Sequence, residues 1–513
     1  MSHTPPTVVT HDPTNVGTTS ATINGEVTAM GDAPEYIGFF AIRVSGGSWQ
    51  GTSGYQLSQP ASWSINISGL QEGYSYDYAA IAQYDYGGST YQEWGNIVTF
   101  TALELHDYEH GSGTEQDPYQ IWNEDDLDGV RGYLDKHFIQ KAALDLTEFD
   151  PWIPFGTFSG VYDGGNFLIY NVDVDVVAHG NKERAGLFSL VNGGKLKNIR
   201  VHGTFYGAKY VGALTGMLVN GEVDNCHSTG EITGQEYVGG LLGYSQASNC
   251  YNSGSGCKVT GEHVSDDYIS IAYFGGYGNV YTAEVESRLC GGFVGGVQAS
   301  PSEFKNCYAK GDVKCGDSEQ ELENYYGAYV GGFWGQAFHV KIDSCYAKGD
   351  AKGSFAIGGF GGICEDVEIS NCYSMGSVTP HRDADLYLHL EGEPSLRLLR
   401  ALGGFMGRFQ DPAGTTEYEH FAKHCYSTGF VHTMDSLANQ SGGFTYSPGN
   451  KVVGENNYYD KETAQQTDTT LATPKTTAEM VYPYSDPENV YINWAFYGED
   501  PDPVWVHDRG GQK

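Results

Sequence analysis

Apolar and polar residues alternate with a period of two along most of this chain, and glycine, asparagine and aspartate separate the alternating runs. That pattern is typical of β-strands that bury one face and are joined by tight turns. Several such runs lie before residue 104, among them TSATINGEV, EYIGFFAIRV and YSYDYAAIAQYD. We therefore predict a small antiparallel β-sandwich over residues 1–103.

A glycine-rich motif returns along the next part of the chain. It pairs a Gly-Gly-apolar-apolar-Gly turn, such as VGGLLG at 238–243, with a second turn, such as NCYNSG at 249–254. The first glycines of successive copies are Gly212, Gly239, Gly291, Gly331, Gly358, Gly403 and Gly442, at intervals of 27, 52, 40, 27, 45 and 39 residues. The shortest interval fits one coil of a β-solenoid. We predict a right-handed parallel β-solenoid over 104–460 and a capping segment over 461–513.

The longer intervals between copies hold either insertions or additional coils. Candidate insertions are 255–289, 315–328, 379–400 and 410–422. Because each coil stacks on the next, an insertion has to loop outwards, and we expect the insertions on one flank. The stacking of coils is enough to explain why the residues of the glycine-rich motif repeat. We therefore expect the protein to recognise its partner through the insertions.

Six cysteines are interpreted as occupying one slot of the repeat: Cys226, Cys250, Cys307, Cys345, Cys372 and Cys425. A side chain that recurs at one slot of stacked coils forms a ladder, and a buried cysteine packs as a small apolar residue. We interpret these six as buried thiols, with stacked disulfides as the alternative. Cys257 and Cys290 are the candidates for a disulfide at the base of the insertion 255–289. No cysteine or histidine spacing indicates zinc.

The chain has 64 acidic and 28 basic residues and a net charge of −36 at pH 7. This charge argues against nucleic acid or an anionic membrane as a partner attracted over long range. No stretch approaches the roughly 20 apolar residues of a membrane span, and the N-terminus MSHTPPTVVTHDP has no visible secretion signal. We therefore expect either a removed leader or release by another route, such as assembly into a virus particle.

Two stretches of the first 103 residues resemble a fibronectin type III domain. PPTVVTHDPTNVGTTSATINGEV is similar to the opening strands of that family. Leu70, Gly73, Tyr76 and Tyr78 match its Leu-Xaa-Xaa-Gly-Xaa-Xaa-Tyr-Xaa-Tyr corner, in which the tyrosine has a packing role. This resemblance implies a sandwich fold and says nothing specific about function.

Residues 111 to about 480 resemble surface proteins of bacteria and viruses that carry GLUG repeats. Gly111–Tyr119 and Phe158–Asn166 are similar to the beginning of that unit, and the glycine turns are similar to the repeat itself. NNYYDKETAQQTDTTLATPKTTAEM is similar to its closing segment. The resemblance implies adhesion or recognition, and a C-terminal segment that caps the last coil.

Aromatic residues of the insertions are the candidate binding residues: Tyr273, Tyr277, Tyr281, Tyr325, Tyr326 and Tyr387. Flat rings beside Asp, Asn and Gly suit stacking on sugar rings or on a partner protein, and the alternative is that the rings cover turns. Asp266 and Asp267 are the candidates for a Ca²⁺ site, without the spacing of an EF-hand loop.

Catalytic residues are harder to find in this sequence. Parallel β-solenoids often carry polysaccharide lyases or hydrolases, which need carboxylates that converge on one groove. Asp173 and Asp175 share a strand face, and Asp383 and Asp385 lie beside His381. With 64 acidic residues such neighbours arise by chance, and none lies in a catalytic motif. We predict a protein that is not an enzyme and has no cofactor other than Ca²⁺.

These features together predict an all-β structural and recognition protein of a virion or of an extracellular cell surface. The leading hypothesis is a viral tail fibre or spike for host attachment. The alternatives are a cellular or S-layer-associated adhesin and a polysaccharide-degrading β-helix enzyme. Expected partners are a host or cell-surface glycan or protein, and other virion or envelope proteins through the N-terminal domain. Homo-oligomers stay open, because no coiled-coil segment enforces one state.

Overall fold

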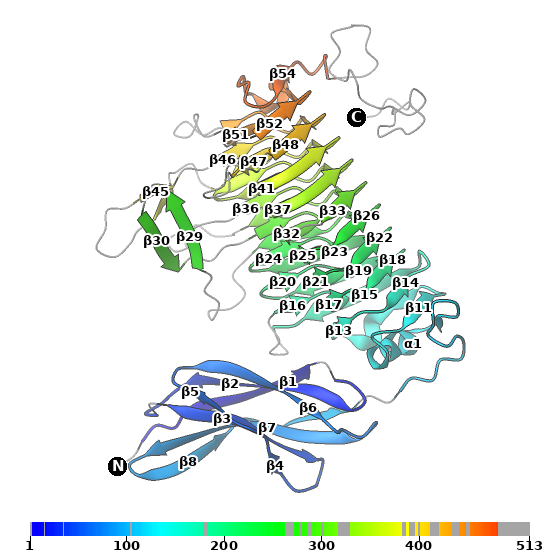
Figure 1. The fold of residues 1–513 in the computed structure, drawn as a ribbon, viewed down its shortest axis with the longest axis vertical. Helices are drawn as coiled ribbons and strands as arrows, with labels where there is room; N and C mark the ends of the chain where they lie inside the picture. The colour runs from blue at the N-terminus through cyan, green and yellow to red at the C-terminus, as the bar shows by residue number, and fades with distance from the viewer. Residues whose placement is uncertain are drawn as a thin grey trace.

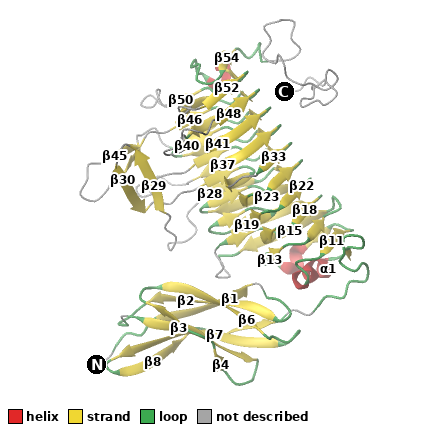
Figure 2. Cartoon of the chain, viewed as in Figure 1, coloured by secondary structure: helices red, strands yellow, loops and turns green. Residues whose placement is uncertain are grey.

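The structure is a computed structural model that describes part of the 513-residue chain. Described residues are 3–14, 16–33, 35–102, 105–177, 183–261, 271–276, 279–284, 289–298, 302–315, 329–381, 386–388, 396–398, 401–410, 420–432, 441–447 and 452–480. In 271–276, 279–284, 386–388 and 396–398 the description covers the backbone alone. An antiparallel sandwich is followed by a long stack of parallel coils (Figure 1 and Figure 2).

Two antiparallel sheets form the N-terminal sandwich. One holds β1 (Thr7–Thr14), β2 (Ser20–Ala29) and β6 (Ala61–Ser68), and the other holds β3 (Tyr36–Val44), β4 (Gln50–Gly51), β5 (Tyr55–Leu57), β7 (Ser75–Tyr86), β8 (Ser89–Trp94) and β9 (Val98–Thr101). Ile23, Phe40 and Tyr78 are fully buried in its core. The Gln71 backbone N–H donates to the buried Tyr76 hydroxyl over 2.8 Å, so this tyrosine has the expected packing role. Membership of the fibronectin type III family stays a prediction.

Three parallel sheets of 18, 15 and eight strands form the walls of the solenoid. One coil contains β20 (Tyr210–Val211) in the eight-stranded sheet, β21 (Thr215–Val219) and β22 (Glu222–Asp224) in the 18-stranded sheet, and β23 (His227–Gly234) in the 15-stranded sheet. The next coil repeats this path as β24 (Tyr237–Gly239), β25 (Leu242–Gln246), β26 (Asn249–Tyr251), β27 (Gly254–Ser255) and β28 (Lys258–Gly261). The prediction of an all-β fold with a parallel solenoid is therefore confirmed.

The first coils also contain one α-helix and two 3₁₀ helices. They comprise β10 (Tyr119–Ile121), α1 (Glu124–Gly129), η1 (Val130–Gly132), β11 (His137–Gln140), β12 (Leu144–Asp145), η2 (Leu146–Phe149), β13 (Phe155–Phe158), β14 (Val161–Asp163), β15 (Leu168–Asp175), β16 (Arg184–Ala185), β17 (Phe188–Asn192), β18 (Lys195–Lys197) and β19 (Arg200–Tyr206).

The later coils repeat the same path up to the last described strand. They comprise β31 (Leu289–Gly291), β32 (Val294–Gln298), β33 (Glu303–Lys305), β34 (Tyr308–Ala309), β35 (Val313–Cys315), β36 (Tyr329–Gly331), β37 (Trp334–Asp343), β38 (Tyr346–Ala347), β39 (Ala351–Gly353), β40 (Ala356–Gly358), β41 (Gly361–Ser370), β42 (Tyr373–Ser374), β43 (Val378–Pro380), β46 (Ala401–Gly403), β47 (Met406–Phe409), β48 (His420–Lys423), β49 (Tyr426–Ser427), β50 (Ser441–Gly442), β51 (Thr445–Ser447), β52 (Val452–Glu455), β53 (Tyr458–Asp460), α2 (Lys461–Ala464) and β54 (Thr473–Lys475).

Register along the eight-stranded sheet decides between insertions and additional coils. Gly239 pairs with Gly291, Gly291 with Gly331, Gly331 with Gly358, Gly358 with Gly403, and Gly403 with Gly442. Each interval between glycine turns is therefore one coil, and the longer intervals hold insertions. Stacking at this turn excludes side chains, because a Cβ on Gly332 would lie 2.2 Å from the Gly359 carbonyl oxygen.

Most insertions leave the solenoid at one corner, between the 15-stranded and the eight-stranded sheets. Two of them contain antiparallel hairpins, β29 (Ile271–Gly276) with β30 (Asn279–Glu284) and β44 (Leu386–Leu388) with β45 (Leu396–Leu398), which lie on one flank in Figure 1. Residues 410–422 differ, because β47 and β48 both belong to the 18-stranded sheet. The expectation of a single flank is therefore wrong for that segment. The first insertion is also shorter than expected, since β28 pairs within its sheet up to Gly261.

A stack of phenylalanine rings runs through the later coils. Phe293, Phe333, Phe360, Phe405 and Phe444 are fully buried, and their ring centroids are successively 4.8, 5.1, 4.8 and 4.7 Å apart. Each ring follows a Gly-Gly turn, so the GGF motif places the same side chain at the same depth in successive coils. Burial of each ring stabilises the coil by about 1.5–3 kcal/mol.

The cysteine ladder differs from the predicted one at a single place. Cys250 pairs with Val223 in the 18-stranded sheet, while the Cys226 backbone N–H donates to Ser253 Oγ over 3.0 Å. Ser253 therefore occupies the ladder slot in that coil, and the assignment of Cys250 to the ladder is wrong. Further along the ladder, Cys345 Sγ accepts from the Cys307 backbone N–H over 3.3 Å.

All ten cysteines are buried thiols that form no disulfide. The predicted bridge between Cys257 and Cys290 is therefore wrong. Cys257 lies in the turn between β27 and β28, where its backbone N–H donates to Ser255 Oγ, whereas Cys290 lies in the eight-stranded sheet. A Cβ on Gly261 would lie 2.4 Å from Cys290 Sγ, so this thiol packs on another wall of the coil.

Asparagine explains the actual register of the ladder. Asn225, Asn252, Asn306 and Asn371 each have a positive φ of 50–55°, and each precedes the ladder slot. Asn tolerates this left-handed conformation better than other non-glycine residues. Asn225 Nδ2 also donates to Asn198 Oδ1 over 2.8 Å, and Asn306 Nδ2 donates to Asn252 Oδ1 over 3.2 Å. These corner residues join neighbouring coils outside the β-ladders.

The described part of the C-terminal segment continues the solenoid. After α2, β54 pairs in parallel with β53 and extends the 15-stranded sheet. Residues 481–513 of the predicted cap lie outside the described residues. Among the described residues, no helix has the length and apolar character needed to span a membrane.

Candidate functional site

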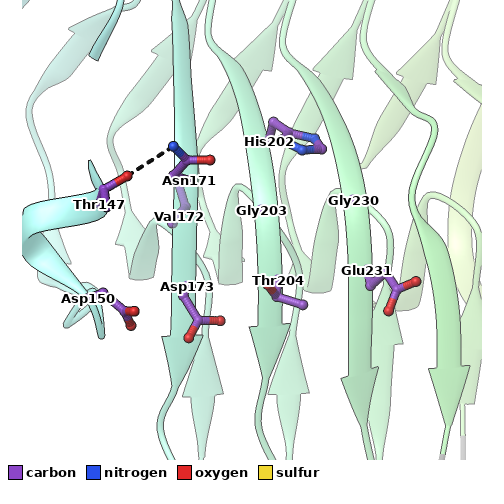
Figure 3. Close-up of a pocket in the computed structure, with 10 residues that line it drawn as sticks. All are labelled: Thr147, Asp150, Asn171, Val172, Asp173, His202, Gly203, Thr204, Gly230 and Glu231. Carbon is purple, nitrogen blue, oxygen red and sulfur yellow. Dashed lines mark hydrogen bonds between the residues drawn. The ribbon is translucent and has the colours of Figure 1, made fainter. Parts of the chain in front are cut away.

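A groove of about 610 Å³ lies on the outer face of the 15-stranded sheet, near its first coils. It is lined by Thr147, Asp150, Asn171, Val172, Asp173, His202, Gly203, Thr204, Gly230 and Glu231 (Figure 3). Most of these side chains are hydrogen-bonding groups, and three of them carry carboxyl groups. The groove is therefore acidic and offers several hydrogen-bonding groups beside apolar surface.

Strand alternation directs these side chains outwards. Val172 and Val174 of β15 are buried, so Asp173 between them points away from the core. Asp173 is in register with Thr204 of β19, and Thr204 is in register with Glu231 of β23. The three side chains consequently form a row across three coils.

The 3₁₀ segment η2 forms one edge of the groove. Asp145 caps it by accepting from the Thr147 backbone N–H over 3.2 Å. The same carboxylate also accepts from the Thr147 hydroxyl over 2.6 Å and from Asn171 Nδ2 over 2.8 Å. Hydrogen bonds from Thr147 and then Asn171 keep the pKa of the Asp145 carboxyl below its usual value. At the far end of the segment, the Trp152 backbone N–H donates to the Asp173 carbonyl oxygen over 2.6 Å. These contacts hold the segment against β15.

A bulge in β15 helps to shape this edge. The pairing of β15 with β19 shifts register between Ile169 and Val172, and Asn171 within the bulge has φ 57°. Bulges commonly re-aim a side chain next to a functional site. Here the bulge turns the Asn171 amide towards Thr147, whose hydroxyl it reaches over 3.0 Å (Figure 3).

Asp150 and Asp173 lie side by side at the end of η2 (Figure 3). The pKa of the Asp173 carboxyl is raised, first because partial burial disfavours its charge. A hydrogen bond from Thr204 opposes this shift, while the charge of Asp150, a hydrogen bond with Asp150 and the charge of Asp175 add to it. The pKa of the Asp173 carboxyl therefore lies above that of an isolated aspartate.

Glu231 lies two strands away from this pair. At about 4.8 Å per strand, the Cα atoms of Asp173 and Glu231 are roughly 9.6 Å apart. Glu231 is exposed, and its Oε1 lies 4.0 Å from the Lys258 ammonium group. The groove thus combines a carboxyl group whose pKa is raised with a second, exposed carboxyl group on the opposite side.

The binding and metal residues predicted from the sequence lie elsewhere. Tyr273, Tyr281 and Tyr387 belong to hairpin strands whose side chains are not described. Tyr277, Tyr325, Tyr326, Asp266 and Asp267 lie outside the described residues. These assignments stay predictions. Among the described residues, no group of three or more His, Cys, Asp or Glu side chains is arranged to hold a metal ion.

The sequence analysis named Asp173 and attributed the presence of Asp175 on the same strand face to chance. The missing signal was Asp150, which follows an irregular segment and meets Asp173 only through the fold. His202, Thr204 and Glu231 could have been found from the outward positions of β19 and β23, since each faces the solvent beside a buried neighbour.

No protein-family model matches the chain, and no curated protein matches it. Among solved structures, the chain is similar to the sensor domain of the anti-sigma factor RsgI4 from Pseudobacteroides cellulosolvens, with 18% identity, 20% of this chain and 97% of that chain covered, and a TM-score of 0.17. It is also similar to an IgA1 protease, with 13% identity, coverage of 83% and 29%, and a TM-score of 0.41. A family 28 exopolygalacturonase from Yersinia enterocolitica has 11% identity, coverage of 92% and 98%, and a TM-score of 0.18. At these TM-scores the functional argument depends on the chain's own residues.

Proposed function

We propose that this chain is a recognition protein of a virion or cell surface and that its groove binds a glycan. The observation that carries this proposal is the row formed by Asp173, Thr204 and Glu231, with Asn171 and His202 beside it. Carboxylates, amides, hydroxyls and imidazole are donors and acceptors that match the hydroxyl groups of sugars. Strands in register hold these groups in place before the ligand arrives, which lowers the entropic cost of binding.

The overall architecture is consistent with a presenting role. Successive coils form a long scaffold, and most insertions leave it at one corner, where their aromatic residues would be available to a second partner. The fibronectin type III-like sandwich would then join the solenoid to other virion or envelope proteins. Locating the protein by mass spectrometry in purified particles and in cell envelopes tests this setting, and its presence only in the cytosol would contradict it.

Glycan binding is tested with the full chain on an array of host and bacterial glycans, followed by titration of the best ligand. Asp173→Asn and Glu231→Gln should each weaken binding about tenfold or more, because a hydrogen bond to a charged group contributes about 1.5–3 kcal/mol. Glu368→Gln is the matched control, since Glu368 is exposed on β41 of the 18-stranded sheet. An array without ligands, or equal affinity of all variants, would contradict the proposal.

A second candidate function is glycoside hydrolysis with inversion. The Cα atoms of Asp173 and Glu231 are roughly 9.6 Å apart, and inverting enzymes need about 6.5–9.5 Å between their two carboxyl groups, so side chains that lean towards each other would meet that spacing. Asp173, with its raised pKa, would give its proton to the glycosidic oxygen while Glu231 takes a proton from the attacking water. The products would be a free alcohol and a sugar hemiacetal of opposite anomeric configuration.

Turnover separates the two candidates. If the groove is catalytic, the wild-type chain releases reducing ends from a bound glycan, and both Asp173→Asn and Glu231→Gln lose this activity while Asp173→Asn still binds. If it is a binding site only, the ligand stays intact over prolonged incubation. Proton NMR of the first product would show the inverted anomer for the enzyme.

A further inference from the structure

Four lysines form a compact group on the outer face of the 15-stranded sheet, beyond the groove. We call Lys310, Lys314, Lys348 and Lys352 the lysine frame. Lys310 and Lys314 belong to one coil, and Lys348 and Lys352 belong to the next. The frame exists because the segment YAKGDVK at 308–314 is followed one coil later by YAKGDAK at 346–352.

Register places these lysines opposite one another. Lys314 pairs with Lys352 between β35 and β39, at about 4.8 Å between the strands. Tyr308 pairs with Tyr346, and the Lys348 backbone N–H donates to the Ala309 carbonyl oxygen over 2.9 Å, which brings Lys348 beside Lys310. The frame therefore consists of two like-charged pairs, separated by four residues along the strand direction.

Tyrosine rings support one of these pairs. The rings of Tyr308 and Tyr346 are stacked with centroids 5.4 Å apart and planes at 12°. Lys310 Nζ lies 4.4 Å from the centroid of Tyr308, and Lys348 Nζ lies 5.3 Å from the centroid of Tyr346. Cation–π contacts of this kind hold the two ammonium groups over a rigid aromatic stack.

Three lysines of the frame form no ion pair with a described carboxylate. Lys310, Lys348 and Lys352 are exposed, and none of the three has a carboxylate within 4.0 Å in the described part of the chain. Asp312 and Asp350 lie between the lysine pairs, where the carboxylates are engaged by backbone groups. Asp312 Oδ1 accepts from the Asp350 backbone N–H over 2.9 Å, and Asp350 Oδ1 accepts from the Ser377 backbone N–H over 2.7 Å.

Like charges directly opposite in neighbouring strands destabilise a sheet. In a chain with net charge −36, four lysines in two adjacent coils are also a local reversal of sign. At physiological ionic strength the Debye length is about 8 Å. The frame therefore attracts a bound anion more strongly than the more distant acidic residues repel it. The charge of the frame is complementary to an anionic ligand that spans both pairs.

The arrangement also limits how that ligand carries its charge. A polymer with an anionic group on every unit would place one of them against Asp312 and Asp350, at the centre of the frame. A polymer with charged and neutral sugars in alternation would place hydroxyl groups there, and the free oxygens of both carboxylates could accept hydrogen bonds from them.

We propose that the lysine frame binds an acidic polysaccharide in which charged sugars alternate with neutral ones. This inference goes beyond the groove, because the frame lies in other coils and uses charge rather than carboxyl groups to select its ligand. A variant that loses glycan binding in the groove should still bind the acidic polysaccharide at the lysine frame. A variant of the lysine frame should likewise still bind the glycan in the groove.

The test measures binding of the full chain to three immobilised polymers: hyaluronan with alternating charge, polygalacturonate with a charge on every sugar, and neutral dextran. We expect the tightest binding to hyaluronan, weaker binding to polygalacturonate and none to dextran. Binding should weaken as sodium chloride rises from about 0.05 to 0.5 M, because salt screens the contacts. The Asp173→Asn chain should bind hyaluronan as well as the wild type.

Variants locate the site. Lys310→Gln with Lys348→Gln should weaken hyaluronan binding at least tenfold, and Lys310→Arg with Lys348→Arg should retain it. The control Lys195→Gln with Lys305→Gln removes the same charge from the 18-stranded sheet and should bind as the wild type does. Thermal unfolding of each variant confirms that it is folded.

The proposal would be overturned if the Lys310→Gln, Lys348→Gln chain bound hyaluronan as the wild type does. It would also be overturned if polygalacturonate bound as tightly as hyaluronan, or if the wild type did not bind hyaluronan. Duplex DNA and vesicles with anionic lipid are measured in parallel. Binding to either of them that is tighter than to hyaluronan would assign the frame to that partner instead and would equally overturn the proposal.

Discussion

The groove and the lysine frame share one sheet and one strand register but differ in charge and chemistry. One inward row of this sheet is apolar throughout: Val174, Phe205, Ile232, Val259, Val313, Ala351 and Val378. The adjacent outward row changes from coil to coil: Asp173, Thr204, Glu231, Lys258, Asp312, Asp350 and Ser377. Stacking restricts the inward row, whereas water accepts any polar side chain in the outward row. A solenoid can therefore carry unrelated binding sites on one continuous face.

The largest predicted effect tests whether the coils of the groove and the coils of the lysine frame open independently of each other. Phe360→Ala removes a fully buried ring from the stack near the lysine frame and should cost about 3–5 kcal/mol. Because a coil contacts only its neighbours, amide hydrogen exchange should speed up in β36–β47 and stay unchanged in β15–β23. Leu214→Ala, which empties a buried position near the groove, should give the opposite distribution. Equal loss of protection in both regions would show that the solenoid unfolds as one unit.

The next prediction tests whether an asparagine at positive φ stabilises the corner of the coil both near the groove and near the lysine frame. Asn225→Ala puts alanine at φ 51°, and this unfavourable backbone conformation alone should lower the free energy of unfolding by about 1–2 kcal/mol. The variant also loses the hydrogen bond from Asn225 to Asn198. Asn225→Gly should cost less, because glycine tolerates this φ. Urea unfolding measures both. Asn306→Ala, at φ 55° near the lysine frame, should behave alike, and a cost confined to one of the two positions would contradict a shared role.

Of the two sites, the groove should show a pH-dependent effect on stability. The folded chain holds the Asp173 proton at pH values at which the unfolded chain has released it, because the pKa of Asp173 is raised from 3.8. Ionisation therefore costs stability that is absent below pH 3.8 and fully present above the raised pKa. Relative to the wild type, Asp173→Asn should gain stability as the pH rises through this window and then reach a plateau. Thermal unfolding between about pH 3 and pH 7 measures it.

The control for that prediction is Glu368→Gln, which lies on another sheet and should show no gain of this kind. A difference between Asp173→Asn and the wild type that is constant over the whole pH range would contradict the role assigned to Asp150 and Asp173.

The smallest effect concerns repulsion within the lysine frame. Lys352→Gln removes a charge directly opposite Lys314 and should stabilise the chain by about 0.2–1 kcal/mol at low salt. The gain should disappear in about 1 M salt, where charges are screened. Lys305→Gln, which removes a partner of Asp343 at 3.7 Å, should give no gain. A loss of stability in Lys352→Gln would show that repulsion in the frame is already compensated.

Sequence patterns were sufficient for the repeating part of the fold. The 27-residue interval between Gly212 and Gly239 is the actual step of the solenoid, and the longer intervals contain insertions because the glycines stay in register. The same patterns failed at Cys250. Its motif NCY is identical to that of Cys307, but the corner of its coil is formed by Asn252 at φ 50° rather than by Asn249. Local sequence alone does not reveal which asparagine turns the chain.

By itself, the sequence determined the period of the coils, the identity of the inward residues and the places where the repeat is interrupted, because stacking imposes the same local requirement on every coil. Only the tertiary structure decided which outward residues meet. Asp150 reaches Asp173 through an irregular segment, and Lys348 lies beside Lys310 although 38 residues separate them in the chain. The path of the irregular segment brings Asp150 to Asp173 and leaves no periodic trace in the sequence, whereas the repeated segments YAKGDVK and YAKGDAK mark Lys310 and Lys348 as equivalent positions that only the inter-coil register makes neighbours.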